Sequence, residues 1–398
     1  MQIANRLSKV APSATLALAQ KAREMSAAGQ SVISLTAGEP DFPTPIHIVD
    51  ALKTSVDEGR TRYTAVTGTP ELRAAIRGKY ASRGFDYAVD QIIATTGAKQ
   101  ALYNGLMASV DEGQEVVFAA PYWLSYADMV RLAQGVPKVI ETTEAQRFVM
   151  TPDQLRGALG PSTRAVIINS PSNPTGAVYR AEDFAALAEV LADFPDVLII
   201  ADEIYEHLIY GDQKFTSILD ADPRLMKRTL LVSGCSKSYA MTGLRLGWAA
   251  GPKPLIAAMA KLQGQCTSNP SAPIQDAAIA AITGSHKPVE EMLAAFDGRR
   301  QKFVAGLNAL PGVTCFDPEG AFYAFANVSS YQGRKLPDGQ AIQDGTDICN
   351  YLLDSVGVVV VPGAPFGAPQ YFRASFATDQ ATLDEGLKRM AEALGKIE

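Results

Sequence analysis

The sequence lacks the motifs of several common enzyme classes. No two of its 32 glycines are separated by a single residue, so the G-x-G-x-x-G loop that binds dinucleotides is absent. Neither Gly78-Lys79 nor Gly395-Lys396 follows a glycine at the spacing of a Walker A loop. The G-x-S-x-G turn of serine hydrolases does not occur either. These absences disfavour the usual NAD-dependent, ATP-dependent and serine-hydrolase classes.

Cysteine and histidine are scarce and scattered. The four cysteines show no C-x-x-C spacing, which is typical of reduced thiols in a cytoplasmic protein. The three histidines lie far apart in the sequence, and there is no H-E-x-x-H motif. We therefore expect no metal centre.

Positive charge and long apolar runs are also in short supply. The net charge of -6 and the pI near 5.3 disfavour a nucleic-acid or anionic-membrane surface. No uninterrupted apolar run approaches the roughly 20 residues of a membrane helix. The first ten residues lack the apolar segment of a secretion signal. We expect a cytoplasmic protein without membrane or nucleic-acid partners.

Six short apolar runs predict a buried sheet. They are rich in Val, Ile, Leu and Ala without polar alternation, as in largely parallel strands covered on both faces. The runs span residues 91–96, 115–120, 164–169, 197–202, 229–233 and 246–250. Several end in a residue with chemistry, among them Asn169, Asp202 and Ser233. Because ligands collect at the carboxyl ends of such strands, we expect an α/β fold with one crevice there.

The pattern changes near residue 290. A long helical pattern over 289–307 is followed by alternating segments over 320–325 and 356–361 and a terminal helix over 383–394. The polar, glycine-rich stretch 329–345 predicts a surface loop. We expect a large domain over 46–289, with 1–45 as an N-terminal segment and 290–398 as a smaller α+β domain.

The most informative motif runs from Ser233 to Gly247 and holds a lone lysine, Lys237, eight positions before Arg245. A lysine in a tight turn of small residues at a strand end can lose its proton and attack an aldehyde. An arginine within reach suits a phosphate, because its fork grips two oxygens. Together they meet the requirements of pyridoxal 5'-phosphate (PLP), although two surface charges would also explain them.

Further candidate residues follow the same strands. Asp202 would be partly desolvated, which favours a cationic partner such as a protonated pyridine nitrogen, but a helix N-cap explains it equally well. Tyr205 could bond the 3-oxygen of the same ring or simply pack. Asn173 lies in a turn, which alone accounts for an asparagine there. Gly97-Ala98 forms a strand-to-helix junction, where free N–H groups attract phosphate.

These motifs together resemble class I PLP-dependent aminotransferases. The segment around Lys237 fits the attachment pattern of that family, and the likeness runs from about Ala11 to the C-terminus. Five further motifs keep the family's order: Gly38-Glu-Pro-Asp-Phe42, Pro121-Tyr-Trp123, Asn173-Pro-Thr-Gly176, Asp202-Glu-Ile-Tyr205 and Phe372-Arg-Ala-Ser375. The segments 12–15 and 239–243 resemble the bacterial aspartate/prephenate branch. The resemblance implies the aspartate aminotransferase fold, with a mostly parallel seven-stranded sheet in the large domain.

The resemblance also implies a role for each candidate residue. Lys237 would bind PLP covalently and then move protons, and Asp202 would pair with the pyridinium nitrogen. The remaining cofactor contacts would come from Gly97, Ala98, Lys99, Trp123, Asn173, Tyr205, Ser236, Arg245 and, from the neighbouring subunit of a homodimer, Tyr63. Substrate would contact Gly38, Lys99, Trp123, Asn173 and Arg373. Another branch of the family has a histidine behind the aspartate where this chain has Tyr126, which leaves the support of Asp202 undefined.

The expected activity is ping-pong transamination, with aspartate favoured as donor and 2-oxoglutarate as acceptor. Lys99 motivates the dicarboxylate, because the resemblance implies that its cation, at the mouth of the crevice, contacts the distal carboxylate of the substrate. The alternatives are that Lys99 only balances the phosphate charge or that it points to solvent.

Relatives often have a basic residue at the position of Ala11, where it helps to close over acidic or prephenate-like substrates. Its loss would weaken the binding of long dicarboxylates and shift the preference towards aromatic or neutral amino acids. An aromatic amino acid or prephenate aminotransferase is the alternative activity. A PLP-dependent lyase or synthase of the same fold and a PLP-binding regulatory module are further alternatives.

Overall fold

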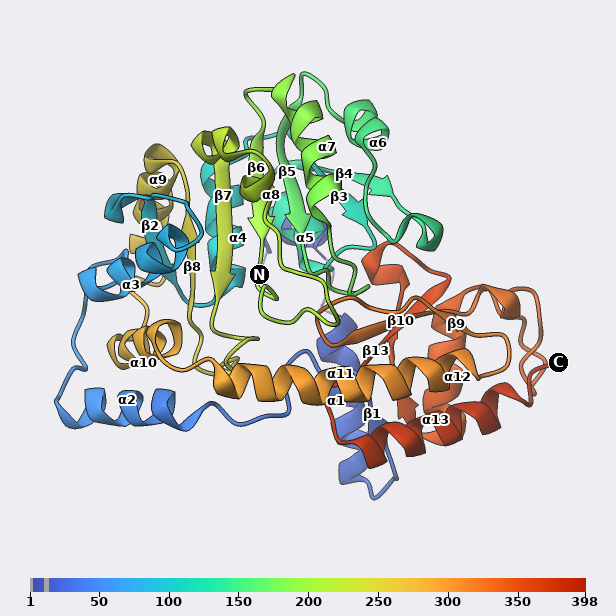
Figure 1. Cartoon of the computed structure of the whole chain (residues 1–398). Helices are drawn as coiled ribbons and strands as arrows, with labels where there is room; N and C mark the ends of the chain where they lie inside the picture. The colour runs from blue at the N-terminus through green and yellow to red at the C-terminus, as the bar shows by residue number, and fades with distance from the viewer. Residues whose placement is uncertain (1–2, 11–13) are drawn as a thin grey trace.

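The computed structural model describes residues 3–10 and 14–398, so Ala11, Pro12 and Ser13 lie outside the described residues. Its centre is a seven-stranded sheet in the order β2-β8-β7-β6-β5-β3-β4 (Figure 1). The strands are β2 (Ile92–Thr95), β3 (Glu115–Ala120), β4 (Val136–Glu141), β5 (Thr163–Asn169), β6 (Leu198–Asp202), β7 (Thr229–Gly234) and β8 (Gly247–Ala250). Only β8 runs antiparallel to its neighbours, β2 and β7. The predicted mostly parallel seven-stranded sheet is confirmed.

The edge strand β4 was not predicted from the sequence. Its sequence, Val-Pro-Lys-Val-Ile-Glu, contains a proline and a lysine, and most of its residues are partly or fully exposed. A proline and a charged residue are typical of an edge strand, where they discourage pairing with another chain. The strand therefore lacks the continuous apolar run that marks its buried neighbours.

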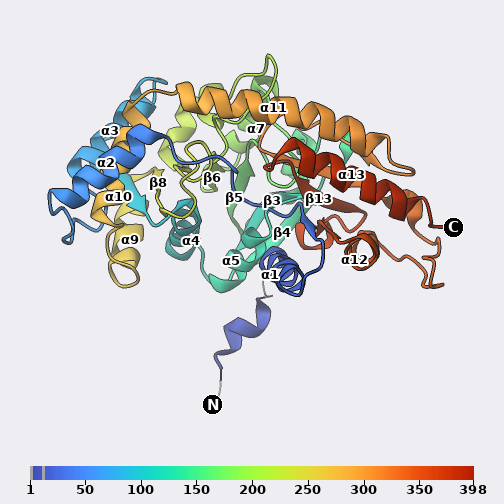
Figure 2. The same ribbon diagram turned by 90° about the horizontal axis from the view of Figure 1, so that it is seen from below.

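Helices cover both faces of the sheet. On one face lie α4 (Ala98–Ser109), α5 (Ser125–Leu132) and α9 (Lys253–Gly264), and on the other α7 (Ala181–Ala192) and α8 (Ile218–Ala221) (Figure 1, Figure 2). Successive residues of β6 divide between two cores: Ile200 packs in the core of Leu102 and Val130, and Ile199 in that of Leu187. This alternation follows from the two-residue period of a strand.

Several helices begin at recognisable caps. The hydroxyl of Thr69 accepts from the N–H of Leu72 at the start of α3 (Pro70–Ala81), where a proline occupies the first turn. Thr151 and Gln154 form a capping box at the start of α6 (Pro152–Ala158). Such caps satisfy N–H groups that a helix start leaves free. Two further helices are α2 (Ile46–Asp57) and α10 (Ala272–Thr283).

A second, four-stranded sheet follows the long helix α11 (Lys287–Asn308). Its order is β12-β13-β10-β9, built from β9 (Thr314–Cys315), β10 (Tyr323–Asn327), β12 (Val361–Pro362) and β13 (Tyr371–Ser375). The helices α12 (Gly345–Val356) and α13 (Gln380–Leu394) pack beside it (Figure 1). The predicted helices over 289–307 and 383–394 are confirmed, whereas α12 and β13 were not foreseen.

The alternating segment predicted over 356–361 is divided in the structure. Val356 ends α12, and Gly357 adopts a left-handed conformation with φ 68°. The remainder divides into β11 (Val358–Val359) and β12. β11 pairs in parallel with β1 (Ile33–Ser34), which ties the N-terminal segment, including α1 (Ala14–Ala27), to the small sheet. Within residues 3–10 and 14–398, every helix is too short or too polar to cross a membrane.

Candidate active site

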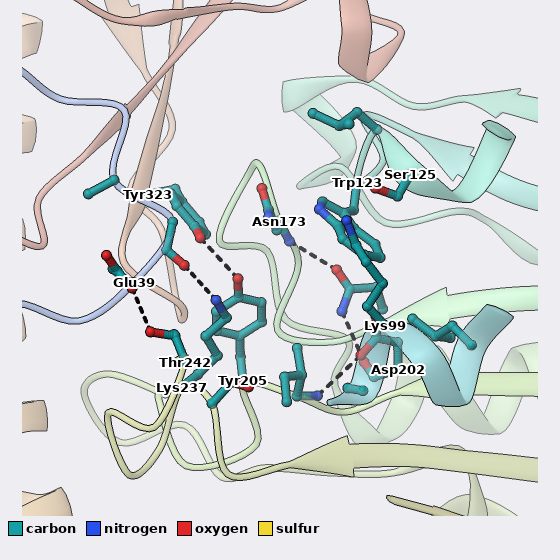
Figure 3. A pocket seen from close by; sticks show the side chains of 18 of the residues that line it. Glu39, Lys99, Trp123, Ser125, Asn173, Asp202, Tyr205, Lys237, Thr242 and Tyr323 are labelled. Atoms are coloured by element: carbon teal, nitrogen blue, oxygen red, sulfur yellow. Dashed lines mark hydrogen bonds between the residues drawn. The ribbon is translucent and has the colours of Figure 1, made fainter. Parts of the chain in front are cut away.

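A cavity of about 540 Å³ lies at the carboxyl ends of the parallel strands. One wall comes from the large sheet, through Asn169 at the end of β5, Asp202 at the end of β6 and Lys237 in the loop after β7. Tyr323 of β10 lies on the opposite wall (Figure 3). Arg373 of β13 also lines the cavity. The strand ends therefore converge on one crevice, as the sequence predicted.

Lys237 presents a partly desolvated amine to this cavity. Its Nζ donates to the backbone carbonyl of Gly38 at 2.5 Å. Burial lowers the pKa of Lys237 to about 8; the carboxylate of Glu39 opposes this shift, and the charge of Arg373 adds to it. With a pKa of about 8, about a tenth of the amine is uncharged at pH 7, and this neutral form is the one that attacks a carbonyl carbon.

Asp202 is almost completely buried, and its carboxylate accepts two hydrogen bonds. The Tyr126 hydroxyl donates to Oδ2 at 2.6 Å and the Ile204 N–H to Oδ1 at 3.3 Å. Burial raises the pKa of Asp202 to about 6, and the bond from Tyr126 opposes this rise. A turn rather than a regular helix follows Asp202, so the helix N-cap alternative does not apply. The sequence did not show which side chain stabilises the carboxylate of Asp202 from behind, and the structure shows that Tyr126 does so through its hydroxyl.

Arg373 is buried at 2% exposure without a carboxylate partner in the described part of the chain. Its guanidinium donates to Asn173 Oδ1 at 3.0 Å and to the carbonyl of Thr36 at 3.2 Å, while Nε has no partner among the described residues. A buried cation held only by neutral oxygens favours an anionic ligand, because an unpaired buried charge is costly. Because Arg373 lines the cavity, a carboxylate of a ligand bound there can accept two hydrogen bonds from its guanidinium.

A second group of residues that suits an anion lies at the start of α4. Gly97 precedes the helix with φ 84°, and a Cβ atom there would lie 2.7 Å from Nη2 of Arg245. Only glycine therefore allows this guanidinium to approach the helix N-terminus, whose N–H groups attract anions. Ser236 and Ala98 line the same cavity, and the Thr242 carbonyl accepts from Arg245 at 2.8 Å.

Lys99 and Trp123 stand together in the cavity wall. The Nζ atom of Lys99 lies 4.8 Å from the centroid of the Trp123 ring (Figure 3). Burial lowers the pKa of Lys99, and the charge of Arg245 adds to this effect. The cation thus lies over the aromatic face that also borders the cavity.

Two predicted cofactor residues, Tyr63 and Gly97, do not line the cavity, although Gly97 adjoins Arg245, which does. The side chain of Tyr63 is 91% exposed. Tyr205, by contrast, lines the cavity, and its hydroxyl lies 3.0 Å from that of Tyr323. Within the described residues no cluster of His, Cys, Asp and Glu has the arrangement of a metal site.

Comparisons with known proteins decide the family. The sequence model of "Aminotransferase class I and II" matches residues 30–390. The aspartate aminotransferase of Rhizobium meliloti is 45% identical, with 100% of this chain and 97% of the relative covered, and the aspartate/prephenate aminotransferase of Cereibacter sphaeroides is 46% identical, with 98% and 97% covered. The chain belongs to the class I and II aminotransferase family.

Solved structures agree with this assignment. The crystal structure of the Rhizobium meliloti aspartate aminotransferase superposes on this aminotransferase with a TM-score of 0.97 at 44% identity, covering 100% of both chains. The Thermus thermophilus aspartate aminotransferase, solved with maleate, gives a TM-score of 0.92 at 39% identity, covering 99% of this chain and 100% of the other. The predicted fold and family are confirmed.

Sequence reasoning missed several residues in the cavity wall of this aminotransferase. They are Arg23, Thr36, Glu39, Ser125 and Tyr323. Glu39 directly follows Gly38, and its carboxylate accepts from the Thr242 hydroxyl at 2.5 Å. Tyr323 follows Gly320-Ala-Phe322, and in such an apolar segment the sequence predicts a tyrosine ring packed in the core. Only contacts between distant segments reveal these residues, so no local signal could have identified most of them.

We expect Tyr126→Phe to raise the pKa of Asp202 above about 6. The lost hydroxyl stabilises the charged carboxylate, and a hydrogen bond to a charged group contributes ~1.5–3 kcal/mol, about one to two pH units. Infrared difference spectroscopy of the protein at varied pH measures the carboxyl group, with Asp202→Asn to identify its band. Tyr122→Phe is the matched control. An unchanged titration in Tyr126→Phe would show that this bond does not stabilise the carboxylate.

Proposed function

We propose that this aminotransferase holds PLP in the cavity and transfers the amino group of aspartate to 2-oxoglutarate. The observation that carries the proposal is the amine of Lys237, whose pKa is lowered to about 8, in one cavity with two separate anion sites. One anion site suits a phosphate and the other an α-carboxylate. A lyase, a synthase or a binding module would need no acceptor 2-oxo acid. Turnover that depends on added 2-oxoglutarate therefore distinguishes an aminotransferase from these alternatives.

The residues of the cavity fit the cofactor group by group. Gly97, Ala98, Ser236 and Arg245 would hold the phosphate, because the space that a Cβ would fill at Gly97 admits the guanidinium of Arg245. The buried carboxylate of Asp202 would pair with the protonated ring nitrogen, and Trp123 would stack on the ring. Tyr205 and Asn173 would bond its phenolic oxygen. When bound, PLP supplies the electron sink for a negative charge at the substrate Cα.

The chain's own residues would bind the amino acid and move its protons. Arg373, held by Asn173 and the Thr36 carbonyl, would bind the α-carboxylate together with the backbone of Gly38. The neutral amine of Lys237 would take the proton from the substrate Cα and deliver it to C4′ of the cofactor. A base with a pKa near the working pH is the most effective for such transfers.

We expect Lys237→Ala to abolish turnover while the protein folds and still binds PLP non-covalently. The variant loses both the nucleophile and the proton carrier, so the rate should fall by on the order of 10²- to 10⁴-fold or more. The measurement is the 2-oxo acid released from L-aspartate by the unaltered chain and the variant: repeated turnover is expected from the unaltered chain when 2-oxoglutarate is present, and about one equivalent per site without it. Lys253→Ala, an exposed lysine paired with Asp90, is the control. Substantial turnover by Lys237→Ala, without an added amine, would contradict the proposal.

The substrate class rests on the cations of the cavity wall. Lys99 over Trp123 and Arg23 of α1 both contribute to this wall and suit the distal carboxylate of a dicarboxylic acid. The Thermus thermophilus relative was solved with maleate, a four-carbon dicarboxylate. Several relatives are named aspartate/prephenate aminotransferase, so a prephenate-type substrate is the second candidate.

We expect Lys99→Ala to lower kcat/KM for aspartate by on the order of tenfold or more, because a charged contact at the distal carboxylate is lost. The same variant should barely affect phenylalanine, which has no distal carboxylate. Steady-state kinetics with both donors measure the difference, with Lys253→Ala as the control. Equal losses for both donors would make Lys99 a cofactor or structural residue.

The exposed Tyr63 motivates a homodimer with shared sites. At 91% exposure and outside its own cavity, its side chain is available to a second copy, where the phosphate of PLP is its proposed ligand. A soluble oligomer with two-fold symmetry would place this tyrosine at the partner's site in both directions.

Mixing inactive Lys237→Ala chains with inactive Tyr63→Ala chains tests the sharing. Each mixed dimer should regain one intact site, so an equal mixture should recover about a quarter of the unaltered activity. The rate after subunit exchange, with exchange shown by a mass or fluorescence label, gives the answer. Exchange without recovery would contradict a shared site.

A further inference from the structure

Tyr323 is a buried tyrosine of the cavity wall that the proposed chemistry leaves without a role. It belongs to β10 of the small sheet, is 1% exposed, and its hydroxyl lies 3.0 Å from that of Tyr205. Figure 3 shows the two hydroxyl groups pointing toward one another. Because Tyr205 follows β6 of the large sheet, this hydrogen bond joins the two sheets across the cavity.

Tyr323 also contacts the buried arginine of the cavity. The guanidinium carbon of Arg373 lies 4.4 Å from the centroid of the Tyr323 ring. Phe325, two residues along β10, pairs with Arg373 of β13, so the antiparallel register fixes this contact. Both side chains are buried, and water therefore screens the charge little. Tyr323 thus touches both the proposed carboxylate-binding arginine and the proposed partner of the cofactor's phenolic oxygen.

We propose that Tyr323 is a positioning residue that couples carboxylate binding at Arg373 to the hydrogen bond that Tyr205 gives the cofactor. This inference rests on the proposed function of the cavity.

The hydrogen bonds that this role requires are compatible with the chemistry of the two hydroxyl groups. A tyrosine hydroxyl donates one hydrogen bond and can also accept. When Tyr205 donates to the phenolic oxygen of PLP, its own oxygen is free to accept from Tyr323. Hydrogen bonds in a chain polarise one another, so the bond from Tyr323 makes Tyr205 a stronger donor. A stronger donor favours the ionised phenolic oxygen and lowers the pKa of the bound cofactor.

The charge of Arg373 affects the strength of the hydrogen bonds that run from Tyr323 through Tyr205 to the cofactor. Burial raises the pKa of Tyr323, and the nearby charge of Arg373 opposes that rise. The cation therefore makes Tyr323 a stronger donor, and a carboxylate bound to Arg373 weakens that influence. The other charged and titratable groups near Lys237 and Tyr205 stay unchanged in the variants below; they are Glu39, Asp202 and Arg245.

Tyr323→Phe tests the coupling, because phenylalanine keeps the ring beside Arg373 and removes only the hydroxyl. The measurement is the pH titration of the absorbance of the PLP-loaded protein, with and without saturating maleate. We expect the pKa of the bound cofactor to rise by about 0.5 in the variant, part of the effect of one hydrogen bond. We also expect maleate to raise this pKa less in Tyr323→Phe than in the unaltered chain.

Two further variants separate coupling from a merely structural role. Tyr210→Phe removes another buried hydroxyl, which donates to the Ala321 carbonyl outside the cavity, and should leave the pKa unchanged. In a Tyr205→Phe background, Tyr323→Phe should have no additional effect, because the coupling passes through the Tyr205 hydroxyl. In Tyr205→Phe alone, maleate should also raise the pKa of the cofactor less than in the unaltered protein. This variant therefore tests the series of hydrogen bonds even if Tyr323→Phe does not fold.

Defined results would overturn the inference. These are a cofactor pKa equal in Tyr323→Phe and the unaltered chain, an equal shift in Tyr210→Phe, or an undiminished effect of Tyr323→Phe in the Tyr205→Phe background. Thermal unfolding without cofactor verifies that each variant folds. An unaltered chain that binds no PLP would overturn the proposed function as well, whereas bound PLP with an unchanged pKa overturns the role of Tyr323 alone.

Discussion

The desolvation of the Lys237 amine is the constraint on which the rest of the site depends. An ammonium group is costly to bury, so its pKa falls to about 8 and the neutral form becomes accessible. The surroundings limit this fall: the Gly38 carbonyl accepts from Nζ, and the carboxylate of Glu39 favours the charged form. Near neutral pH, Lys237 therefore populates both the charged and the neutral form, whereas an exposed lysine is almost entirely charged.

The parallel sheet explains why these groups meet. The neighbouring strands β5, β6 and β7 run in one direction, with Asn169 paired to Asp202 and Asp202 to Val232. Their carboxyl ends therefore deliver Asp202 and the Lys237 loop to the same edge. The small sheet supplies Arg373, whose buried guanidinium donates to Oδ1 of Asn173, in the loop after β5 of the large sheet. Each sheet alone supplies only part of the cavity wall.

Those parts of the fold and site that depend on local sequence were predictable. The six buried runs produce six strands of the main sheet because continuous apolar residues fit a strand covered on both faces. The edge strand β4 was missed because Pro137 and Lys138 interrupt its pattern. Lys237 and Asp202 stood out because each lies beside a strand end. The contacts of Tyr126, Glu39 and Tyr323 depend on segments that only the tertiary fold brings together.

Locating the lysine that bonds to the cofactor tests the central claim most directly. The PLP-loaded protein can be reduced with borohydride, which makes the bond to lysine permanent, and its peptides analysed by mass spectrometry. The account predicts a phosphopyridoxyl group on Lys237 alone, because this amine combines a lowered pKa with a place in the cavity beside both anion sites. A label on Lys99, or no labelled lysine in a protein that has bound PLP, would contradict it.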